Sequence, residues 1–160
     1  GLAELYRLTH AAVYGFALSI VKNAQDAEDV LQDVYLQVWQ SAGSYRSQGK
    51  PMAWLLTIAR NLALSRLRER SRTVPLPPED WRVRFAQAPA VTHEERLALE
   101  ALLEALSDQE RQVVALHAIA GLKHREIAQL LSLPLSTVLS RYHRALNKLK
   151  LTLKEENNHA

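Results

Sequence analysis

Basic side chains gather in two separate stretches of this sequence, and side chains of this kind neutralise the phosphates of a nucleic acid. The first stretch holds Arg60, Arg66, Arg68, Arg70 and Arg72, and the second holds Arg141, Arg144, Lys148 and Lys150. The formal net charge of the chain is only +3, so the positive charge is unevenly distributed. Two basic stretches predict two contacts with a polyanion, although two solvated helix faces would give the same pattern.

The sharpest motif in the sequence predicts a helix-turn-helix. A helical pattern over Arg125–Leu131 is followed by a break at residues 132–134 and by a second helix that begins at Leu135. The apolar positions of the first helix would pack against Val138 and Tyr142 of the second. The second helix would then lie in the major groove of duplex DNA, while a helical hairpin inside an unrelated bundle is the alternative.

The second helix of this motif carries the residues that we expect to meet duplex DNA. Those on or near one face, directed toward base edges, are Ser136, Thr137, Ser140 and Arg144. Phosphate contacts are predicted for Arg141, Lys148 and Lys150, and Leu139 and His143 complete the predicted duplex-binding set. Hydrogen-bonding side chains at the N-terminal half of such a helix are placed to read bases.

An acidic and amide-rich stripe follows one face of an earlier predicted helix. Its members are Asp29, Gln32, Asp33, Leu36, Gln37 and Gln40. A leucine in the middle of an exposed polar stripe indicates a protein partner, with a plain solvated face as the alternative. Asp29 and Asp33 alone make a poor metal site, because no histidine or third carboxylate converges on them.

Aromatic and basic side chains alternate between the loop at residues 41–50 and the helix that follows it. They are Tyr45, Arg46, Lys50, Trp54, Arg60, Asn61 and Arg68. This mixture suits single-stranded nucleic acid, whose bases stack on rings while its phosphates meet cations. A tryptophan such as Trp54, considered alone, is more often a core residue than a stacking platform, so the loop residues are the stronger candidates for base contacts.

No arrangement of residues predicts catalysis. The six histidines are scattered, and His117 and His124 are seven apart rather than at the four-residue spacing of helical zinc ligands. The chain has no cysteine, and its 5 glycines are too few for a phosphate-cradling loop. We therefore expect no catalytic residue, no metal, no cofactor and no small-molecule substrate.

Composition and periodicity predict an all-α protein that does not insert into a membrane. Leucine, alanine, glutamate, glutamine and arginine are abundant, and all favour helices. No apolar run approaches the ~20 residues of a membrane span, and no secretory signal precedes the first amphipathic segment, so we expect a cytoplasmic protein. The first residue is Gly1 rather than methionine, which predicts that residues precede it.

Three long helices are predicted in the first half of the chain. The first carries the apolar stripe Leu5, Leu8, Ala12, Val13, Phe16 and Ile20. The second runs from about Ala24 to Gln40 behind an Asn23 N-cap and directs inward Ala27, Val30, Leu31, Val34, Tyr35 and Val38. The third runs from Pro51 to about Arg70 and buries Leu55, Ile58 and Leu62.

A proline-rich stretch divides the sequence into two small helical domains. Four prolines between residues 72 and 93 predict an extended, flexible linker. The expected domains are therefore residues 1–71 and 94–155. In the second domain we expect a helix over Glu94–Leu106, a helix from the Ser107 capping box to about Ala120 before Gly121, and two helices at Arg125–Leu131 and Leu135–Lys150.

These motifs resemble extracytoplasmic-function sigma factors of the sigma-70 family over nearly the whole chain. Residues 26–34 (DAEDVLQDV) and 53–63 (AWLLTIARNLA) resemble the first conserved region of that family, and residues 106–111 (LSDQER) with the helix-turn-helix resemble the second. The resemblance implies two helical domains and the partners RNA polymerase core, promoter DNA and an anti-sigma factor.

The same resemblance implies a role for each group of residues. The helix with Asp29, Gln32 and Asp33 would dock on the clamp helices of the polymerase's largest subunit. The loop at residues 41–50, with Arg60, Asn61 and Arg68, would capture and help to melt the −10 element. The C-terminal helix would read the −35 element, and the linker would thread the polymerase near the RNA exit path.

Four residues depart from the family pattern. Ser65 stands where many members have aspartate, and Lys123 stands where serine or threonine usually caps the first helix of the motif, which predicts a weaker cap. Ser132 replaces a common turn glycine. Leu139 falls where a base-reading arginine or lysine is frequent, which bears on −35 sequence preference.

Two other classes of protein are the alternatives. A helix-turn-helix transcriptional regulator of the response-regulator output type would need a receiver or ligand domain, and residues 2–70 show no alternating βα pattern for one. An RNA-processing or nuclease enzyme lacks the metal or catalytic cluster that it would need. Promoter-dependent transcription with core polymerase separates the sigma factor from the regulator.

Overall fold

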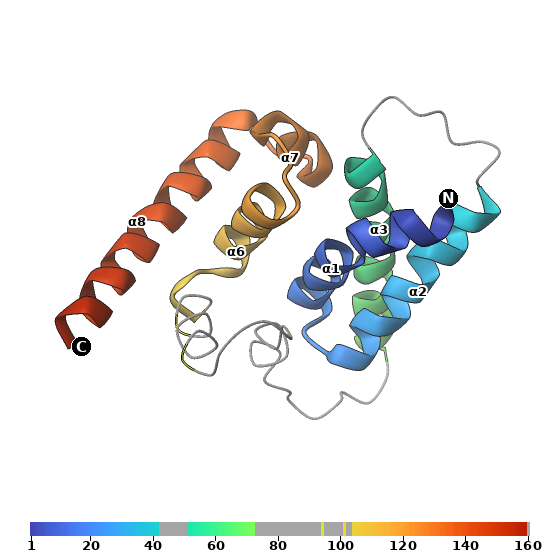
Figure 1. Cartoon of the computed structure of the whole chain (residues 1–160), viewed down its shortest axis with the longest axis horizontal. Coiled ribbons are helices and arrows are strands. Elements are labelled where there is room, and N and C mark those ends of the chain that lie inside the picture. The colour runs from blue at the N-terminus through green and yellow to red at the C-terminus, as the bar shows by residue number, and fades with distance from the viewer. Residues whose placement is uncertain (42–50, 73–93, 95–100, 102–103, 160) are drawn as a thin grey trace. The chain divides into compact units, whose positions relative to one another are not determined.

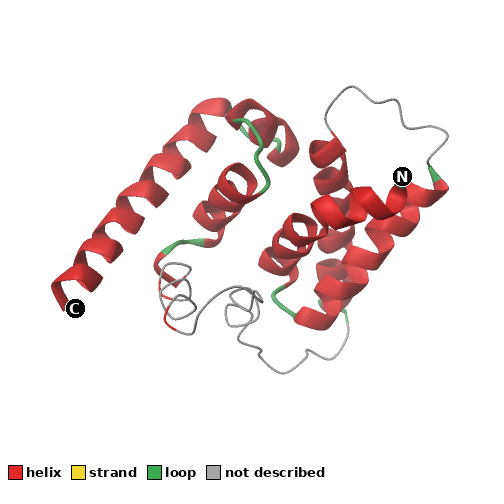
Figure 2. Ribbon diagram, in the orientation of Figure 1, coloured by secondary structure: helices red, strands yellow, loops and turns green. Residues whose placement is uncertain are grey.

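A computed structural model of the chain describes residues 1–41, 51–72, 94, 101 and 104–159. Every regular element in these ranges is helical: α1 (Leu2–Val21), α2 (Ala24–Gln40), α3 (Pro51–Arg70), α6 (Asp108–Val114), the π-helical turn η1 (Ala115–Ile119), α7 (His124–Leu131) and α8 (Leu135–His159) (Figure 2). The chain divides into two compact units, residues 1–81 and 82–160. The predicted all-α class with two helical domains is confirmed.

The limits of the predicted domains remain predictions. The division between the units falls inside the predicted linker, of which only Arg72 belongs to the described residues. Most of the helix predicted over Glu94–Leu106, including Leu97, Leu99, Leu102 and Leu103, also lies outside them.

Local capping fixes the join between α1 and α2. Lys22 adopts the left-handed conformation and donates its backbone N–H to the carbonyl of Leu18 at 2.8 Å, which ends α1. Asn23 is extended, and its side-chain oxygen accepts a hydrogen bond from the backbone N–H of Asp26 at 3.0 Å, which begins α2. The predicted Asn23 N-cap is therefore confirmed.

Helices α1, α2 and α3 pack against one another around the core of the first unit (Figure 1). The fully buried large side chains of this core are Val13, Phe16, Leu18, Val30, Val34, Leu55 and Leu56. The predicted inward positions of Val13, Phe16, Val30, Val34 and Leu55 are confirmed. Leu31 and Leu62 are only partly buried.

Leu8 belongs to the apolar stripe predicted for the first helix, but it faces solvent. Its side chain is 63% exposed, whereas the neighbouring Thr9 is buried. The Thr9 hydroxyl bonds to the carbonyl of Leu5 and to the Tyr35 hydroxyl, both at 2.6 Å. Because adjacent helix positions point about 100° apart, the burial of this satisfied threonine turns Leu8 outward.

The second unit begins its described helices with a capping box. The Ser107 hydroxyl accepts from the backbone N–H of Glu110 at 3.2 Å, and the Glu110 carboxylate accepts from the backbone N–H of Ser107 at 2.8 Å. The helix then widens into the π turn η1 and ends before Gly121, whose φ of +77° favours glycine. The capping box and the end of the helix at Gly121 are confirmed.

The helix-turn-helix is formed by α7 and α8. Ile127 of α7 and Val138 of α8 are fully buried where the two helices pack together. Ser132 ends α7 in the left-handed conformation that glycine usually adopts, with a φ of 56°. Helix α8 runs to His159, beyond the predicted end at Lys150. At the start of α7 the side chain of Lys123 offers no acceptor, and only Glu126 completes half of a capping box.

Candidate nucleic-acid interface

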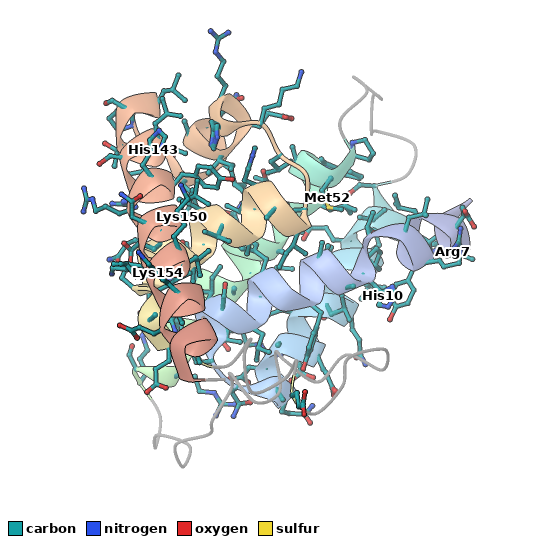
Figure 3. The ribbon with its side chains drawn as sticks, turned by 60° about the vertical axis from the view of Figure 1, so that its left-hand side comes forward. Arg7, His10, Met52, His143, Lys150 and Lys154 are labelled. Carbon is teal, nitrogen blue, oxygen red and sulfur yellow. The ribbon has the colours of Figure 1, made fainter. Side chains whose placement is uncertain are left out.

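The exposed face of α8 brings together the predicted base-reading side chains. Ser136, Leu139, His143 and Arg144 are exposed, and Thr137, Ser140 and Arg141 are half-buried. Val138 and Ala145, which face the opposite way, are fully buried. His143, Lys150 and Lys154 are labelled along this helix in Figure 3.

The side chain of Arg144 lies along the surface of α8. Its Nη2 donates to the Ser140 hydroxyl at 2.9 Å, one turn earlier, and the pair is exposed. A guanidinium that lies over the helix N-terminal half is within reach of base edges when that half enters a groove. The geometry therefore fits the predicted role of both residues in duplex DNA recognition.

Lys148 has an intramolecular partner that the sequence did not reveal. Its ammonium donates to the Glu110 carboxylate at 2.6 Å and so joins α8 to the capping box of α6. Burial alone raises the pKa of Glu110, but the bonds from Lys148 and Ser107 outweigh it and leave that pKa below its ordinary value. The predicted phosphate contact of Lys148 stays a prediction, since the ammonium already stabilises the fold.

Two arginines of the first basic stretch are engaged inside the first unit. Arg70 donates Nη2 to Asp26 Oδ1 at 2.7 Å and Nε to Asp26 Oδ2 at 3.1 Å. Arg66 lies 3.4 Å from Asp26 and 3.1 Å from Asp29. The interpretation of Arg66 and Arg70 as part of a free cationic surface is therefore wrong. They neutralise two carboxylates of α2.

The burial of Asp26 could have been read from its spacing. It lies four residues before Val30 and eight before Val34, on the inward stripe of α2, and its carboxylate is only 4% exposed. A buried charge on an inward stripe requires a partner. The i, i+4 pair Arg66 and Arg70 on α3 supplies it.

Because Arg66 and Arg70 bind carboxylates of α2, the exposed polar face of α3 is smaller than the sequence predicted. Asn61 and Arg68 are exposed and Arg60 is half-buried. Thr57, one turn before Asn61, is also exposed and bonds to the carbonyl of Ala53 at 2.8 Å. The structure thus keeps Arg60, Asn61 and Arg68 available, while Tyr45, Arg46 and Lys50 lie outside the described residues.

The acidic stripe on α2 is exposed except at Asp29. Gln32, Asp33, Leu36 and Gln37 face solvent, and the Leu36 side chain is 54% exposed. Asp29 is half-buried and bound by Arg66 and by the amide of Gln25 at 3.2 Å. Across the part of the chain that the structure describes, no three histidine or acidic side chains gather as a metal site requires.

Trp39 extends this surface and was missed in the sequence. It lies three residues after Leu36 and is 66% exposed, the largest exposed fraction among the described large apolar side chains. Helical spacing alone would have placed it beside Leu36. The exposed surface of α2 therefore combines acidic, amide and apolar groups.

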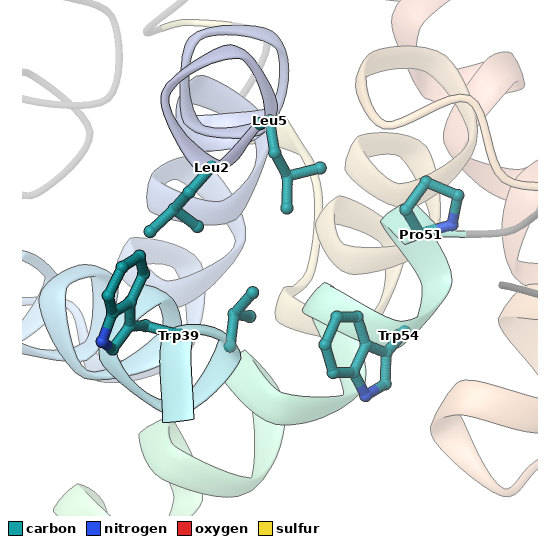
Figure 4. A pocket seen from close by; sticks show the side chains of 7 residues that line it. Leu2, Leu5, Trp39, Pro51 and Trp54 are labelled. Atoms are coloured by element: carbon teal, nitrogen blue, oxygen red, sulfur yellow. The ribbon is translucent and has the colours of Figure 1, made fainter. Parts of the chain in front are cut away.

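Trp39 and Trp54 flank an open apolar pocket of about 480 Å³ (Figure 4). Leu2 and Leu5 of α1 and Pro51 of α3 complete most of its lining. Trp54 is half-buried in this wall, so it is neither a core residue nor a fully exposed stacking platform. The pocket lies where α2 ends and α3 begins.

The expectation that the histidines are scattered is wrong for His117 and His124. Their rings are stacked with centroids 4.2 Å apart, because η1 and the following turn bring the two residues together.

None of the described helices is long and apolar enough to cross a membrane.

Comparison with known families matches both units. The family model for Sigma-70 region 2 matches residues 5–73, and that for Sigma-70 region 4 matches residues 96–149. A helical region 2 followed by a helix-turn-helix region 4 defines a sigma-70-type transcription factor. Within that class, the chain belongs to the extracytoplasmic-function (ECF) sigma factors.

Individual relatives cover nearly the whole chain. The chain is 34% identical over 155 residues to the ECF RNA polymerase sigma factor SigK of Mycobacterium sp. (strain KMS), covering 92% of this chain and 80% of the relative. It is 32% identical to SigK of Mycobacterium tuberculosis (strain ATCC 25177 / H37Ra), covering 92% and 83%. The sigma factor RpoE of Bartonella quintana, solved in complex with the anti-sigma factor NepR, is 26% identical with a TM-score of 0.70 over 95% of this chain and 96% of that chain.

Proposed function

We propose that this chain directs RNA polymerase core to promoters with −10 and −35 elements, initiates transcription there, and is controlled by an anti-sigma factor. The observation that carries the proposal is the pair of unlike surfaces on two separate helical units. One unit presents a helix-turn-helix, and the other presents an acidic protein-docking stripe beside a polar helix face. The chain itself catalyses no step, and it would act in the cytoplasm, where the polymerase is.

Helix α8 would read the −35 element as duplex. Ser136, Ser140 and Arg144 share its exposed face, and Val138 anchors the helix in the core from the opposite side. Thr137, Leu139 and His143 border the same face. Leu139 can meet a thymine methyl group but offers no hydrogen bond, so sequence preference at its position would be apolar.

Helix α2 would dock on the polymerase core through Gln32, Asp33, Leu36 and Gln37. Their exposure and mixed chemistry support this assignment, because interface centres combine apolar anchors with satisfied polar groups. Asp29 would act from the edge of the surface, since Arg66 and Gln25 already hold it.

Helix α3 and the loop before it would hold the melted −10 strand. Asn61 and Arg68 are exposed, Arg60 is half-buried, and Trp54 stands near the N-terminus of the helix. Tyr45, Arg46 and Lys50 would add the stacking ring and the phosphate contacts from the loop. The division of labour would place −10 recognition in residues 1–71 and −35 recognition in residues 94–155.

Control by an anti-sigma factor is supported by the relative solved with one, RpoE with NepR. An inhibitor that covers the acidic stripe of α2 would block polymerase docking without contacting DNA.

Transcription with purified core polymerase tests the proposed function. The full chain should support promoter-dependent initiation, and Asn61→Ala with Arg68→Ala should lower promoter opening while core binding persists. Arg7→Ala is the matched control, because Arg7 is an exposed arginine paired with Glu4 on α1. Tight duplex binding without polymerase, together with no transcription, would instead support a helix-turn-helix regulator.

A further inference from the structure

Three rings from three helical segments meet in the second unit. His117 lies on η1, His124 is the first residue of α7, and Tyr142 lies on α8. The histidine rings stack at 4.2 Å with an angle of 15° between their planes. Tyr142 contacts His117 and His124 with centroids 4.9 Å and 4.8 Å away. This ring cluster therefore joins η1, α7 and α8.

Hydrogen bonding differs between the two histidines. His117 Nδ1 lies 2.8 Å from the carbonyl of Leu122, so Nδ1 carries the proton and Nε2 is the nitrogen that can gain another. His124 Nδ1 is buried and has no hydrogen-bond partner among the described residues. Nothing at that nitrogen would stabilise a charged His124 ring.

The surroundings of His124 oppose a positive charge. His117 faces it from η1, and Tyr142 and His143 lie on α8. Lys123 and Arg125 are its neighbours in the sequence, and both are exposed. The free N–H groups at the start of α7 add a positive dipole end. The carboxylate of Glu126 accepts a hydrogen bond from the backbone N–H of Lys123 at 3.0 Å. Burial first, and then the charges of His117 and His143, lower the pKa of His124.

Tyr142 connects this cluster to the face that meets DNA. It lies two residues after Ser140 and two before Arg144, so both of these residues are on the opposite side of the helix. The contact of its ring with the histidines therefore limits how far α8 can rotate about its axis. The π turn that carries His117 is a helix irregularity of the type found at functional sites.

We propose that His124 is a proton-sensitive positioning residue for the recognition helix α8. The neutral ring stacks on His117 and holds Tyr142, which fixes the orientation of Ser140 and Arg144. The protonated ring repels the neighbouring cations and loses the stack, and α8 is then no longer held in one orientation. The consequence for promoter binding rests on the proposed −35 role of α8, whereas the cluster itself does not.

The direction of the pH dependence follows from the neutral state. Because folding favours neutral His124, the cluster is intact above the ordinary histidine pKa of about 6.5 and is weakened as pH falls below it. Acidification should therefore make the orientation of α8 less fixed.

Nuclear magnetic resonance of the full chain tests the cluster directly. The ring signals of His124 should titrate with a midpoint below about 6.5, and the backbone amides of residues 136–140, which precede Tyr142 and His143, should shift with the same midpoint. His124→Phe keeps an aromatic ring in the stack and should abolish the amide shifts. The matched control, His10→Phe, removes a histidine that stacks on Tyr6 in the other unit and should leave the shifts unchanged. Amides of residues 136–140 that do not shift with pH, or that shift with the same midpoint in His124→Phe, would overturn the proposal.

A second variant keeps the test decisive if His124→Phe does not fold. His117→Phe retains the ring but removes one of the neighbouring positive charges, so the midpoint of His124 should rise. An unchanged midpoint would show that the two rings are not electrostatically coupled and would contradict the proposal.

A promoter-binding measurement with the polymerase holoenzyme separates this inference from the proposed function. Wild type and His124→Phe should bind a promoter fragment equally at about pH 7.5. Wild type should bind several-fold more weakly than His124→Phe once the pH is lowered to about 5.5, below the ordinary histidine pKa of about 6.5. Equal binding at both pH values would overturn the positioning role. Failure of both proteins to bind at the higher pH would instead refute the proposed function, and the amide titration would still decide the cluster.

Discussion

Asp26 and Arg70 are joined by two hydrogen bonds, at 2.7 Å from Nη2 to Oδ1 and at 3.1 Å from Nε to Oδ2. The carboxylate is almost fully buried near the start of α2, and the guanidinium belongs to the last turn of α3. The forked geometry satisfies both carboxylate oxygens, which offsets part of the cost of burying the charge. This pair therefore ties the start of α2 to the last turn of α3.

Loss of the Asp26 charge should destabilise the first unit. Asp26→Asn keeps the shape of the side chain but leaves Arg66 and Arg70 without full neutralisation, and we expect the free energy of unfolding to fall by about 2 kcal/mol. Urea unfolding followed by tryptophan fluorescence measures it, because Trp39 and Trp54 lie in this unit. Glu4→Gln, which removes an exposed ion pair with Arg7, should leave the midpoint unchanged. Equal changes of the unfolding midpoint in the two variants would show that the buried pair stabilises the unit no more than the exposed pair does.

Charge reversal at Asp33 should weaken polymerase binding without loss of fold. Asp33 is exposed on the α2 stripe, so Asp33→Lys should lower the affinity for core polymerase at least tenfold while the urea midpoint is retained. Fluorescence anisotropy of a labelled chain titrated with core enzyme measures the affinity. Reversal of Asp29 is a poorer test, because its carboxylate also neutralises Arg66.

The control for this experiment is Glu4→Lys, which makes the same charge change at an exposed position on α1, outside the predicted stripe. Its affinity for core enzyme should stay within about twofold of wild type at moderate salt, as expected for a charge remote from the contact. If both reversals weaken binding equally, net charge rather than a docked surface determines the affinity.

Truncation of Arg144 should reduce discrimination at one base pair of the −35 element. Arg144→Ala should cost about 1–3 kcal/mol on the preferred sequence and much less on a sequence changed at that base pair. Competition binding of holoenzyme to a panel of promoter fragments measures the difference. Lys154→Ala, also on α8 but nearly three turns further along and exposed, is the control. Equal weakening on every fragment would identify Arg144 as a phosphate contact.

Features that depend on a few neighbouring residues could be predicted from the sequence. The Asn23 cap, the Ser107 capping box and the helix end at Gly121 each involve groups within about four positions, so the residue types nearly determine the local structure. The helix-turn-helix was predicted for the same reason. Its turn at residues 132–134 and its buried Val138 lie within one short segment.

Features that depend on packing between distant segments could not be predicted in this way. Arg70 lies 44 positions from Asp26, and Lys148 lies 38 positions from Glu110. In each case the sequence shows only an arginine or lysine in a basic stretch, which is also how a DNA-binding side chain is distributed. The tertiary contact decides whether such a charge forms an ion pair within the fold or remains exposed to a partner.

The Glu110–Lys148 pair predicts how the second unit responds to acid. The folded pKa of Glu110 is lower than its value of 4.5 in an unfolded chain, so ionised Glu110 stabilises the folded state. This contribution is complete above pH 4.5 and is lost as pH falls from there through the folded pKa. Glu110→Gln should therefore lower the stability of the unit at neutral pH by about 1–2 kcal/mol and flatten its acid dependence.

Hydrogen exchange of amides in α6 and α8, measured from neutral pH down through the carboxylate range, reports the second unit alone. Glu104→Gln, an exposed glutamate just before the capping box, should retain the wild-type profile. A Glu110→Gln profile that runs parallel to wild type would mean that the bond to Lys148 does not lower the pKa of Glu110. Lys148 would then be available to contact a DNA phosphate.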